Sequence, residues 1–179
     1  GVDATHMRSK QLAAFRREQL GFIFQDSNLL DTLTCRENIA LPLTIAHVDP
    51  AQVDGRVEHM AQTLGVVEVL DKFPYQASGG QRQRVAACRA MVTSPTLVLA
   101  DEPTGALDSK NSKLLLERFD ALNEQLDATI LMVTHDVRSA LRGSRILYLS
   151  DGVIAGDLKL GRFDRKDSGR RERLQHFLE

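Results

Sequence analysis

The order of apolar and polar residues along the chain predicts helices that alternate with short strands. A short helix capped by Ser9 precedes the compact apolar run Leu20–Gln25, which predicts a strand that ends on a polar residue. Residues 28–70 then follow a helical pattern that breaks at Pro42 and Pro50. This stretch is typical of a helical subdomain.

The second half of the chain returns to strands that alternate with helices. A helix over residues 81–92 leads into Thr96–Ala100, an uninterrupted apolar run of the kind that is buried on both faces of a parallel sheet. The elements expected after it are a helix over 109–126, a strand over 128–134, a short helix over 136–141, and strands over 145–150 and 151–158. Such alternation is typical of α/β proteins with a layered sheet.

Composition and charge say more about the possible binding partners of the chain than about its fold. With 179 residues and 42% hydrophobic side chains, the chain can bury one core, and its net charge of -1 gives no overall field for nucleic acid or an anionic membrane. The two cysteines, Cys35 and Cys88, match no metal-binding or redox spacing, which favours reduced thiols in a cytosolic protein. No apolar run is long enough to span a bilayer, so we expect a soluble protein, and mixed charges in residues 162–179 favour a solvated helical face.

Two adjacent carboxylates, Asp101 and Glu102, stand where the apolar run Thr96–Ala100 ends. Ligands of open α/β sheets bind at the carboxyl ends of the strands. If both residues continue the strand, their side chains point to opposite faces, so Asp101 can hold Mg²⁺ while Glu102 polarises an attacking water. Taken in isolation, the pair fits a solvated turn better than a catalytic site.

Two other predicted strands also end on polar groups. Gln25 closes the strand Leu20–Gln25, and His135 follows the strand over 128–134. Parallel strands would place Gln25, the two carboxylates and His135 along one edge of a sheet. A metal, a water-orienting group and a donor to the phosphoryl oxygens are what phosphoryl transfer requires, although a lone histidine is most often a surface residue.

A serine and two glycines, Ser78, Gly79 and Gly80, precede the helix over 81–92. Backbone N–H groups and the positive end of the helix dipole can hold a phosphate there, and glycine lets the backbone come close to it. Taken alone, the glycine pair fits a simple turn equally well. The polar strand ends favour the phosphate interpretation.

These stretches resemble the motifs of the nucleotide-binding domains of ATP-binding cassette (ABC) transporters. ASGGQRQR at residues 77–84 resembles the signature motif, with Ala77 where leucine is commonest, and LVLADEP at 97–103 resembles the Walker B strand. The remaining matches are the D-loop (GALD, ending at Asp108), the Q-loop glutamine (Gln25) and the switch histidine (His135).

The resemblance implies ATP and Mg²⁺ as cofactors and gives roles to the matched residues. Glu102, His135 and Gln25 would be catalytic, and Asp101 and Gln25 would hold the metal. The residues that would bind ATP are Ser78, Gly79, Gly80, Gln81 and Asp108.

The implied fold is an α/β P-loop NTPase of the RecA-like type. Its parallel sheet core would take residues 1–30 and 90–160, its helical subdomain residues 31–89, and a C-terminal tail residues 161–179. The family also has an N-terminal β-subdomain and a Walker A strand, with a G-x-x-x-x-G-K-[ST] loop that this sequence lacks. We therefore expect the 179 residues alone neither to bind ATP tightly nor to hydrolyse it, and we expect exposed apolar sheet edges that promote self-association.

The implied function is that of an ATP-binding subunit, which couples ATP hydrolysis to transport through a membrane permease and pairs with a second nucleotide-binding domain as a homodimer. FQDSNLLDTLTCRENIALPL, residues 24–43, resembles the class that works with macrolide-export, lipoprotein-release and antimicrobial-peptide-resistance permeases. Such a subunit is cytoplasmic and peripheral on the inner face of the cell membrane, with no insertion into it and no nucleic-acid partner.

Two alternatives stay open. A non-catalytic, shortened cassette would bind a permease or a partner ATPase and complete the partner's site with its signature motif. A DNA- or ribosome-associated ATPase fragment is the other, although the interval from Gln25 to Ser78 is too short for the long coiled coil of DNA-repair relatives. This last alternative predicts salt-sensitive binding to nucleic acid.

Overall fold

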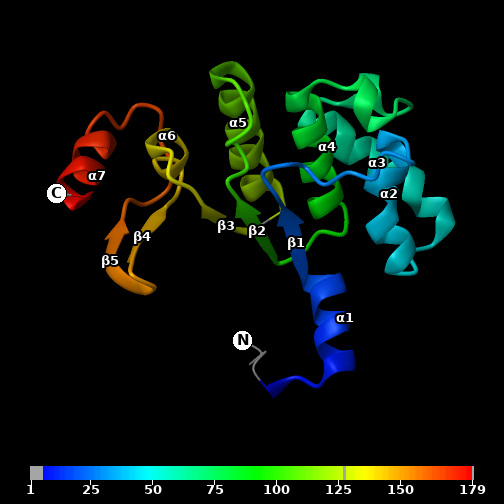
Figure 1. Cartoon of the computed structure of the whole chain (residues 1–179), viewed down its shortest axis with the longest axis horizontal. Helices are drawn as coiled ribbons and strands as arrows, with labels where there is room; N and C mark the ends of the chain where they lie inside the picture. Colours follow the sequence, from blue (N-terminus) through cyan, green and yellow to red (C-terminus); the bar gives the residue numbers. More distant parts are fainter. Residues whose placement is uncertain (1–5, 127, 179) are drawn as a thin grey trace. The chain divides into compact units, whose positions relative to one another are not determined.

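The computed structural model describes residues 6–126 and 128–178, and the chain divides into two compact units with the boundary between Val133 and Thr134 (Figure 1). The elements of the first unit are helix α1 (Ser9–Gln19), strand β1 (Leu20–Ile23), helices α2 (Cys35–Ile45), α3 (Pro50–Leu64) and α4 (Gly79–Met91), strand β2 (Leu97–Asp101), helix α5 (Ser109–Leu126) and strand β3 (Thr129–Val133). Short 3-10 helices at Val67–Val69 and Pro74–Gln76 lie between α3 and α4.

The three strands of the first unit form one parallel sheet in the order β1-β2-β3. Ile23 of β1 lies opposite Ala100 of β2, and Asp101 of β2 lies opposite Val133 of β3. The carboxyl ends of the strands therefore lie at one edge of the sheet, where α/β proteins place their ligands. The parallel sheet predicted from the alternation of strands and helices is confirmed.

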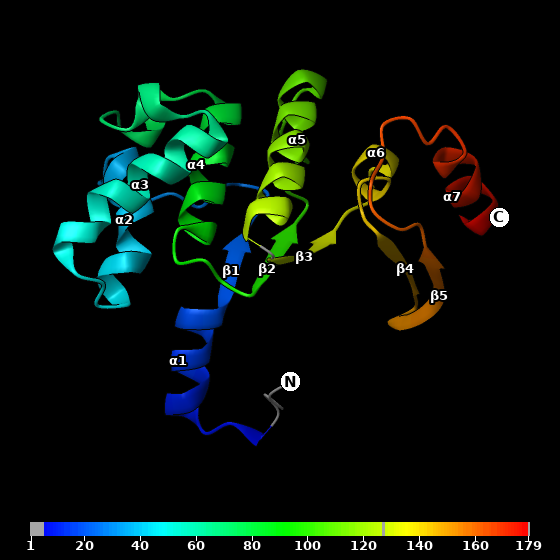
Figure 2. The same ribbon diagram turned by 180° about the vertical axis from the view of Figure 1, so that it is seen from behind.

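Helices cover one face of this sheet and leave the other open. Ile23, Val98 and Ala100 are buried in a core to which α4 and α5 contribute, and these two helices lie side by side (Figures 1 and 2). On the other face, Leu131 and Val133 of β3 are 51% and 62% exposed. The same face of β2 is only partly buried, at Leu97 and Leu99, so the prediction that the run Thr96–Ala100 is buried on both faces is wrong. No helix of the described residues 6–126 and 128–133 packs over this face. β3 is an edge strand of this sheet, and its apolar side chains are exposed, as expected of the sheet edges.

The helical subdomain begins with two capped helices. The hydroxyl of Thr34 accepts a hydrogen bond from the N–H of Glu37 at 3.2 Å, and the Glu37 carboxylate accepts one from the N–H of Thr34 at 2.7 Å, which starts α2. Asp49 caps α3, with Pro50 at the first helical position. Pro42, however, lies inside α2, so the predicted break there is wrong. A proline removes one backbone hydrogen bond, and the buried neighbours of Pro42 keep the helix packed against the core.

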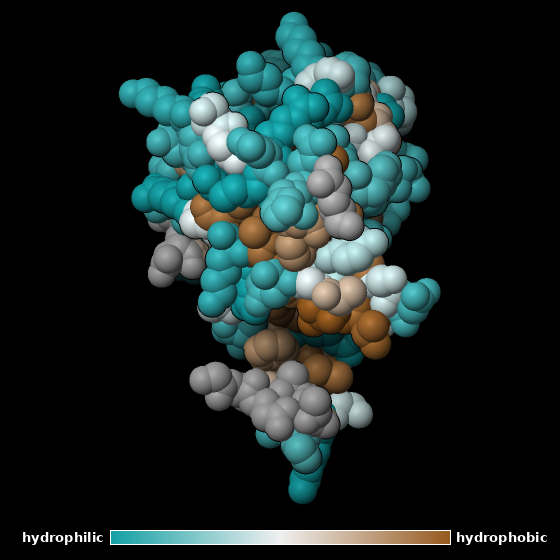
Figure 3. Space-filling model, turned by 90° about the vertical axis from the view of Figure 1, so that its left-hand side faces the viewer, coloured by the Kyte–Doolittle hydropathy of each residue, from teal (hydrophilic) through white to brown (hydrophobic). Residues whose placement is uncertain are grey.

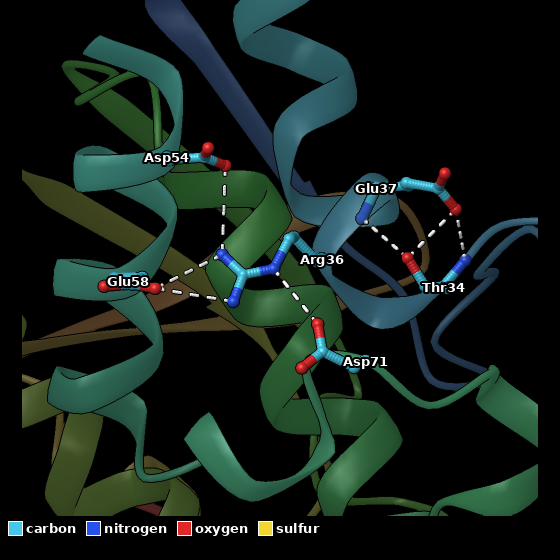
Figure 4. Close-up of polar contacts among 6 residues, drawn as sticks. All are labelled: Thr34, Arg36, Glu37, Asp54, Glu58 and Asp71. Carbon is cyan, nitrogen blue, oxygen red and sulfur yellow. Dashed lines mark hydrogen bonds and ion pairs between the residues drawn. The ribbon is translucent and has the colours of Figure 1, made fainter. Parts of the chain in front are cut away.

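Arg36 joins α2 to the rest of the subdomain through three carboxylates (Figure 4). Its guanidinium lies 3.2 Å from Asp71, 3.4 Å from Glu58 and 3.8 Å from Asp54. All three carboxylates are more than half exposed, so each ion pair contributes little on its own. The same arginine also donates its backbone N–H to the carbonyl of Leu70 at 2.8 Å, which adds a contact that solvent screens less.

The second unit contains α6 (Val137–Ala140), β4 (Arg145–Ser150), β5 (Val153–Lys159) and α7 (Arg170–Leu178). β4 and β5 form an antiparallel hairpin with an irregularity between Tyr148 and Leu149. Several apolar side chains of this hairpin are exposed. The most exposed of them are Leu149, Val153 and Ile154. Figure 3 views the molecule from the left-hand side of Figure 1 and shows apolar surface, in brown, on that side.

A buried arginine holds the second unit together. Arg170 is 3% exposed and donates hydrogen bonds to the carbonyl groups of several residues in the loops of this unit. These acceptors are Leu141, Gly143, Leu160, Gly161 and Arg162. Leu174 of α7 is buried as well, whereas Arg171, Glu172 and Arg173 are exposed, so α7 buries one side and has the solvated helical face that the mixed charges predict. In the described part of the chain, every helix is too short or too polar to cross a lipid bilayer.

Candidate functional site

The carboxyl ends of β1 and β2 bring three of the predicted site residues to one place. Asp101 is the last residue of β2, Glu102 follows it, and Gln25 lies two residues beyond the end of β1. The side chain of Gln25 lies against the loop after Glu102, since a methyl group added at Gly105 would be 3.1 Å from Gln25 Cδ. The structure thus places Gln25, Asp101 and Glu102 at the same sheet edge, and their chemical roles stay predictions.

Glu102 has a backbone conformation that few residues other than glycine adopt. Its φ is 43°, in the left-handed region. Its N–H donates to the carbonyl of Val133 at 2.9 Å, and its own carbonyl accepts from the N–H of Gly105 at 2.9 Å. Two hydrogen bonds therefore hold a strained residue in place, as is common at functional sites. Because β2 ends at Asp101, the prediction that strand alternation turns the two carboxylates to opposite faces does not apply to Glu102.

The oxygen atoms of Asp101 and Gln25 have the chemistry that Mg²⁺ prefers. Magnesium usually keeps several waters and is held by one or two protein groups together with substrate phosphates. A carboxylate and an amide at the ends of paired strands fit that donor set. Among residues 6–126 and 128–178, no group of three His, Cys, Asp or Glu side chains gathers closely enough to hold a metal. A magnesium ion bound mainly through phosphates does not need such a group.

The glycine pair occupies the first turn of α4, and Ser78 is the N-cap of this helix. The Ser78 hydroxyl accepts from the N–H of Gln81 at 3.3 Å, and the Gln81 side chain accepts from the N–H of Ser78 at 2.9 Å. No residue that the structure describes accepts a hydrogen bond from the N–H of Gly79 or Gly80. The space beside Gly79 is open, since the nearest atom to an added methyl group is Arg82 Nη2 at 3.9 Å. An anion can therefore approach this helix end.

Gly80 has a second reason to be glycine. It is buried, and a methyl group there would overlap the side chain of Asn111 in the first turn of α5. Asp108 fixes Asn111 by accepting hydrogen bonds from its backbone N–H and from its side-chain amide, both at 2.8 Å. These hydrogen bonds lower the pKa of the Asp108 carboxyl. Two residues predicted to bind nucleotide, Gly80 and Asp108, thus contact the same asparagine.

His135 lies in the second unit, two residues beyond the end of β3. Its neighbour Asp136 caps α6 and accepts a hydrogen bond from the hydroxyl of Ser139 at 2.9 Å. Burial by itself raises the pKa of Asp136, but the hydrogen bonds from Ser139 and Arg138 bring it below its usual value. Asp136 therefore fixes the backbone next to His135, and the contact of His135 with a phosphate stays a prediction.

Both cysteines are free and buried. Burial raises the pKa of the Cys35 and Cys88 thiols, which keeps them protonated. Neither cysteine belongs to the group formed by Gln25, Asp101 and Glu102.

Three residues support the predicted site residues through contacts that carry no signal in the sequence. Gly105 lies against Gln25, Asn111 lies against Gly80, and Arg89 donates two hydrogen bonds to the loop that follows Gln25. Each contact joins two segments that are far apart along the chain. Pattern and spacing describe neighbours within one element, so they could not have identified these three contacts, although Gly105 itself belongs to the GALD motif.

Comparison with known proteins gives a consistent result. A family model described as ABC transporter matches residues 2–105. The bacitracin export ATP-binding protein BceA of Halalkalibacterium halodurans is 48% identical over 161 residues, which cover 90% of this chain and 64% of that protein. The macrolide export ATP-binding/permease protein MacB of Campylobacter jejuni is 41% identical over 157 residues, which cover 88% of this chain and 24% of that protein. The chain thus spans less than two thirds of the length of BceA.

A solved structure shares the fold. It is the dimeric, post-hydrolysis state of the ATP-binding cassette MJ0796 bound to ADP and Pi, with a TM-score of 0.78 and 36% sequence identity. The match covers 88% of this chain and 70% of that chain. A protein of the same name from Methanocaldococcus jannaschii is 41% identical over 167 residues, which cover 91% of this chain and 71% of that protein. The predicted P-loop NTPase fold of the RecA-like type is confirmed.

Proposed function

Because this chain belongs to the ABC transporter family as an ATP-binding component, we propose that it couples ATP hydrolysis to the transport of a substrate through a membrane permease. The observation that carries this proposal is the meeting of Gln25, Asp101 and Glu102 at one edge of a parallel sheet. Glu102 is held there at a φ of 43°, so its carboxylate starts from a fixed backbone. A fixed carboxylate beside oxygen ligands for a metal suits the transfer of a phosphoryl group to water.

Each residue with a predicted catalytic or metal-binding role takes one task in the proposed reaction: the three residues of this edge, and His135 of the second unit. Asp101 and Gln25 hold Mg²⁺, which when bound neutralises charge on the phosphate oxygens. Glu102 orients the attacking water and accepts a hydrogen bond from it. His135 donates a hydrogen bond to the phosphoryl oxygens, which stabilises the negative charge that they carry.

The glycine pair serves a second cassette. The N–H groups of Gly79 and Gly80 lie at the start of a helix of 13 residues, with no acceptor among the described residues, and the surface beside Gly79 is open. We expect these groups, with Ser78 and Gln81, to contact the phosphates of ATP held by a partner domain. The solved relative MJ0796 is dimeric, which supports a homodimer with nucleotide between the two copies. Asp108 would lie at the same interface.

A groove beside the Gln25 loop is the proposed docking place of the permease. It has a volume of about 500 Å³, and Asp26, Asp31 and Tyr75 are among the residues that line it. Tyr75 is 67% exposed and stacks on Phe73 with ring centroids 5.6 Å apart. Arg82 lines the groove too, so its charged groups are two carboxylates and one guanidinium. Together with the exposed aromatic ring, this excess of negative charge suits a cytoplasmic segment of the permease that carries apolar and basic side chains. Docking there would place the subunit on the cytoplasmic face of the cell membrane.

The cargo class follows from the relatives. BceA is named for bacitracin export and MacB for macrolide export, and the segment 24–43 of this chain resembles the same class. We therefore propose that the permease served by this chain exports an antimicrobial peptide, a macrolide or a related amphipathic molecule. The cassette itself contacts the permease rather than the cargo.

A shortened, non-catalytic cassette remains the second candidate, because these 179 residues contain no G-x-x-x-x-G-K-[ST] loop. Isothermal titration calorimetry with ATP and Mg²⁺ separates the two. The samples are this chain and a chimera in which the part of BceA that precedes the matched region is joined to it. Tight binding by the chimera and none by the chain alone supports the proposed ATPase. A folded chimera that binds no ATP would refute it.

A further inference from the structure

Gln25 and the loop that follows it have two supports that come from distant parts of the chain. We infer that Gly105 and Arg89 are positioning residues for Gln25: Gly105 leaves the space in which its carboxamide lies, and Arg89 holds the loop that carries it. The inference rests on the proposed function in one respect, namely that Gln25 belongs to the site.

Gly105 leaves room for Gln25 through the absence of a side chain. A methyl group at this position would lie 3.1 Å from Cδ, 3.2 Å from Nε2 and 3.3 Å from Cγ of Gln25. These distances are shorter than ordinary van der Waals contacts between carbon atoms, so Gln25 would have to move. Gly105 also donates its N–H to the carbonyl of Glu102 at 2.9 Å. The carboxamide therefore lies on the turn that begins with the strained Glu102.

Arg89 holds the loop after Gln25 through two hydrogen bonds. Its Nη1 donates to the carbonyl of Asn28 at 2.7 Å, and its Nη2 donates to the carbonyl of Ser27 at 2.9 Å. Ser27 and Asn28 have φ values of 60° and 47°, so two successive residues other than glycine adopt the left-handed conformation. Such a pair persists only where other contacts fix it. The two-pronged guanidinium of arginine supplies such a contact, and the single ammonium of lysine does not.

A second side chain of α4 supports the same segment. Gln83 Nε2 donates to the carbonyl of Phe24 at 2.8 Å, directly before Gln25. Arg89 lies six residues further along the same helix, which starts with the glycine pair. One helix of 13 residues, about 20 Å long, therefore joins Gly79 and Gly80 to the Gln25 loop. A shift of the glycine end on contact with a phosphate would move Arg89 and, through it, Gln25.

The test measures the position of Gln25 directly, in the full chain without nucleotide. Proton–nitrogen NMR spectra record the side-chain amide of Gln25, which is identified by its loss in Gln25→Glu. Arg89→Ala and Arg89→Lys test the first support, and Gly105→Ala and Gly105→Val test the second in steps of side-chain size. Arg56→Ala and Gly55→Ala are matched controls on α3, because the Arg56 guanidinium donates a hydrogen bond to Gln52 on the same helix and Gly55 has open space around it.

We expect the chemical shift of the Gln25 side-chain amide to differ from that of the unaltered chain in Arg89→Ala, and to differ from it in Arg89→Lys as well. Hydrogen exchange of the backbone amides in residues 25–30 should rise about tenfold in Arg89→Ala, because the loop opens more often. In the Gly105 series the Gln25 signal should move further for valine than for alanine, while the loop amides keep their protection. Neither control should move it.

An unmoved Gln25 signal in folded Arg89→Ala or in folded Gly105→Val would overturn the role of that residue. If Arg89→Ala fails to fold, Arg89→Lys and the exchange of its loop decide the matter for Arg89. The outcome is independent of the proposed function, because the spectra are recorded without ATP. If Gln25→Ala leaves ATP and Mg²⁺ binding of the chimera unchanged, the role of Gln25 in the site fails while its positioning stands.

Discussion

The side chain of Asn111 occupies the space into which any side chain at Gly80 would have to extend. This contact joins the first turn of α5 to the first turn of α4, so the end of the proposed phosphate-binding helix is set by packing within the chain. Asp108 orients the asparagine through two hydrogen bonds of 2.8 Å. The geometry of the glycine pair thus exists before any ligand arrives.

Gly80→Ala should therefore destabilise the fold. Because the added methyl overlaps Asn111, we expect a loss of about 1–3 kcal/mol in the free energy of unfolding, measured by urea denaturation. Gly79→Ala is the matched control and should change stability by less than about 1 kcal/mol, since its surroundings are open. The double variant Gly80→Ala with Asn111→Ala should recover part of the loss. Equal stability of the two single alanine variants would contradict the contact.

The strain at Glu102 predicts an unusual order of stability. At a φ of 43°, glycine is unstrained and alanine is not, so Glu102→Gly should be more stable than Glu102→Ala by about 1 kcal/mol. Both variants lack the carboxylate, so the difference reports the backbone alone. Thermal unfolding of the two variants under the same conditions measures it. An alanine variant as stable as the glycine variant would show that Glu102 is not held in the left-handed region.

Arg170 should be essential to the second unit. Its loss leaves one buried and several partly buried carbonyl groups without this donor, and we expect Arg170→Ala to cost about 2–4 kcal/mol. Hydrogen exchange should rise in residues 134–178 and much less in β1 and β2. Arg171→Ala changes an exposed arginine next in the chain and serves as the control. Similar exchange in the two variants would contradict the role of Arg170.

Acid should weaken the contact between α4 and α5. Hydrogen bonds from Asn111 lower the pKa of Asp108 in the folded chain, so this carboxylate stabilises the fold at pH values above its unfolded pKa, about 3.9. That stabilisation is lost as the pH falls through the lower, folded pKa. Unfolding measured between pH 7 and pH 2 should therefore show less loss of stability at low pH in Asp108→Asn than in the unaltered chain. Parallel curves would argue against this hydrogen-bonded carboxylate.

The sequence was sufficient for the residues whose role depends on a position at the end of an element. Gln25 and Asp101 could be placed because parallel strands end at one sheet edge, and Ser78 could be placed because serine before a helix is a cap. The open face of β3 could not be derived from its apolar run, which is equally typical of a strand covered on both sides. Whether a helix covers this face of β3 depends on the rest of the chain and not on the residues of the strand itself.

The contacts that give the site its geometry depend on distances across the fold. Hydrogen bonds to Val133 and Gly105 hold Glu102 at its left-handed φ, and neither hydrogen bond can be predicted from the local sequence. Pro42 is a second case in which the local sequence was not enough, because the packing of α2 outweighs the tendency of proline to break a helix. Local patterns therefore predicted the positions of the candidate residues in the fold better than the conformations that they adopt.

The most direct test of the proposed function is the ATP hydrolysis rate of the chimera with BceA, compared between Glu102 and Glu102→Gln. The account predicts that both forms bind ATP with Mg²⁺ equally well, and that the glutamine form hydrolyses it at least about a hundredfold more slowly because it cannot act as a base. Hydrolysis at an unchanged rate in the Glu102→Gln chimera would contradict the assignment of Glu102, and with it the site at the end of β2.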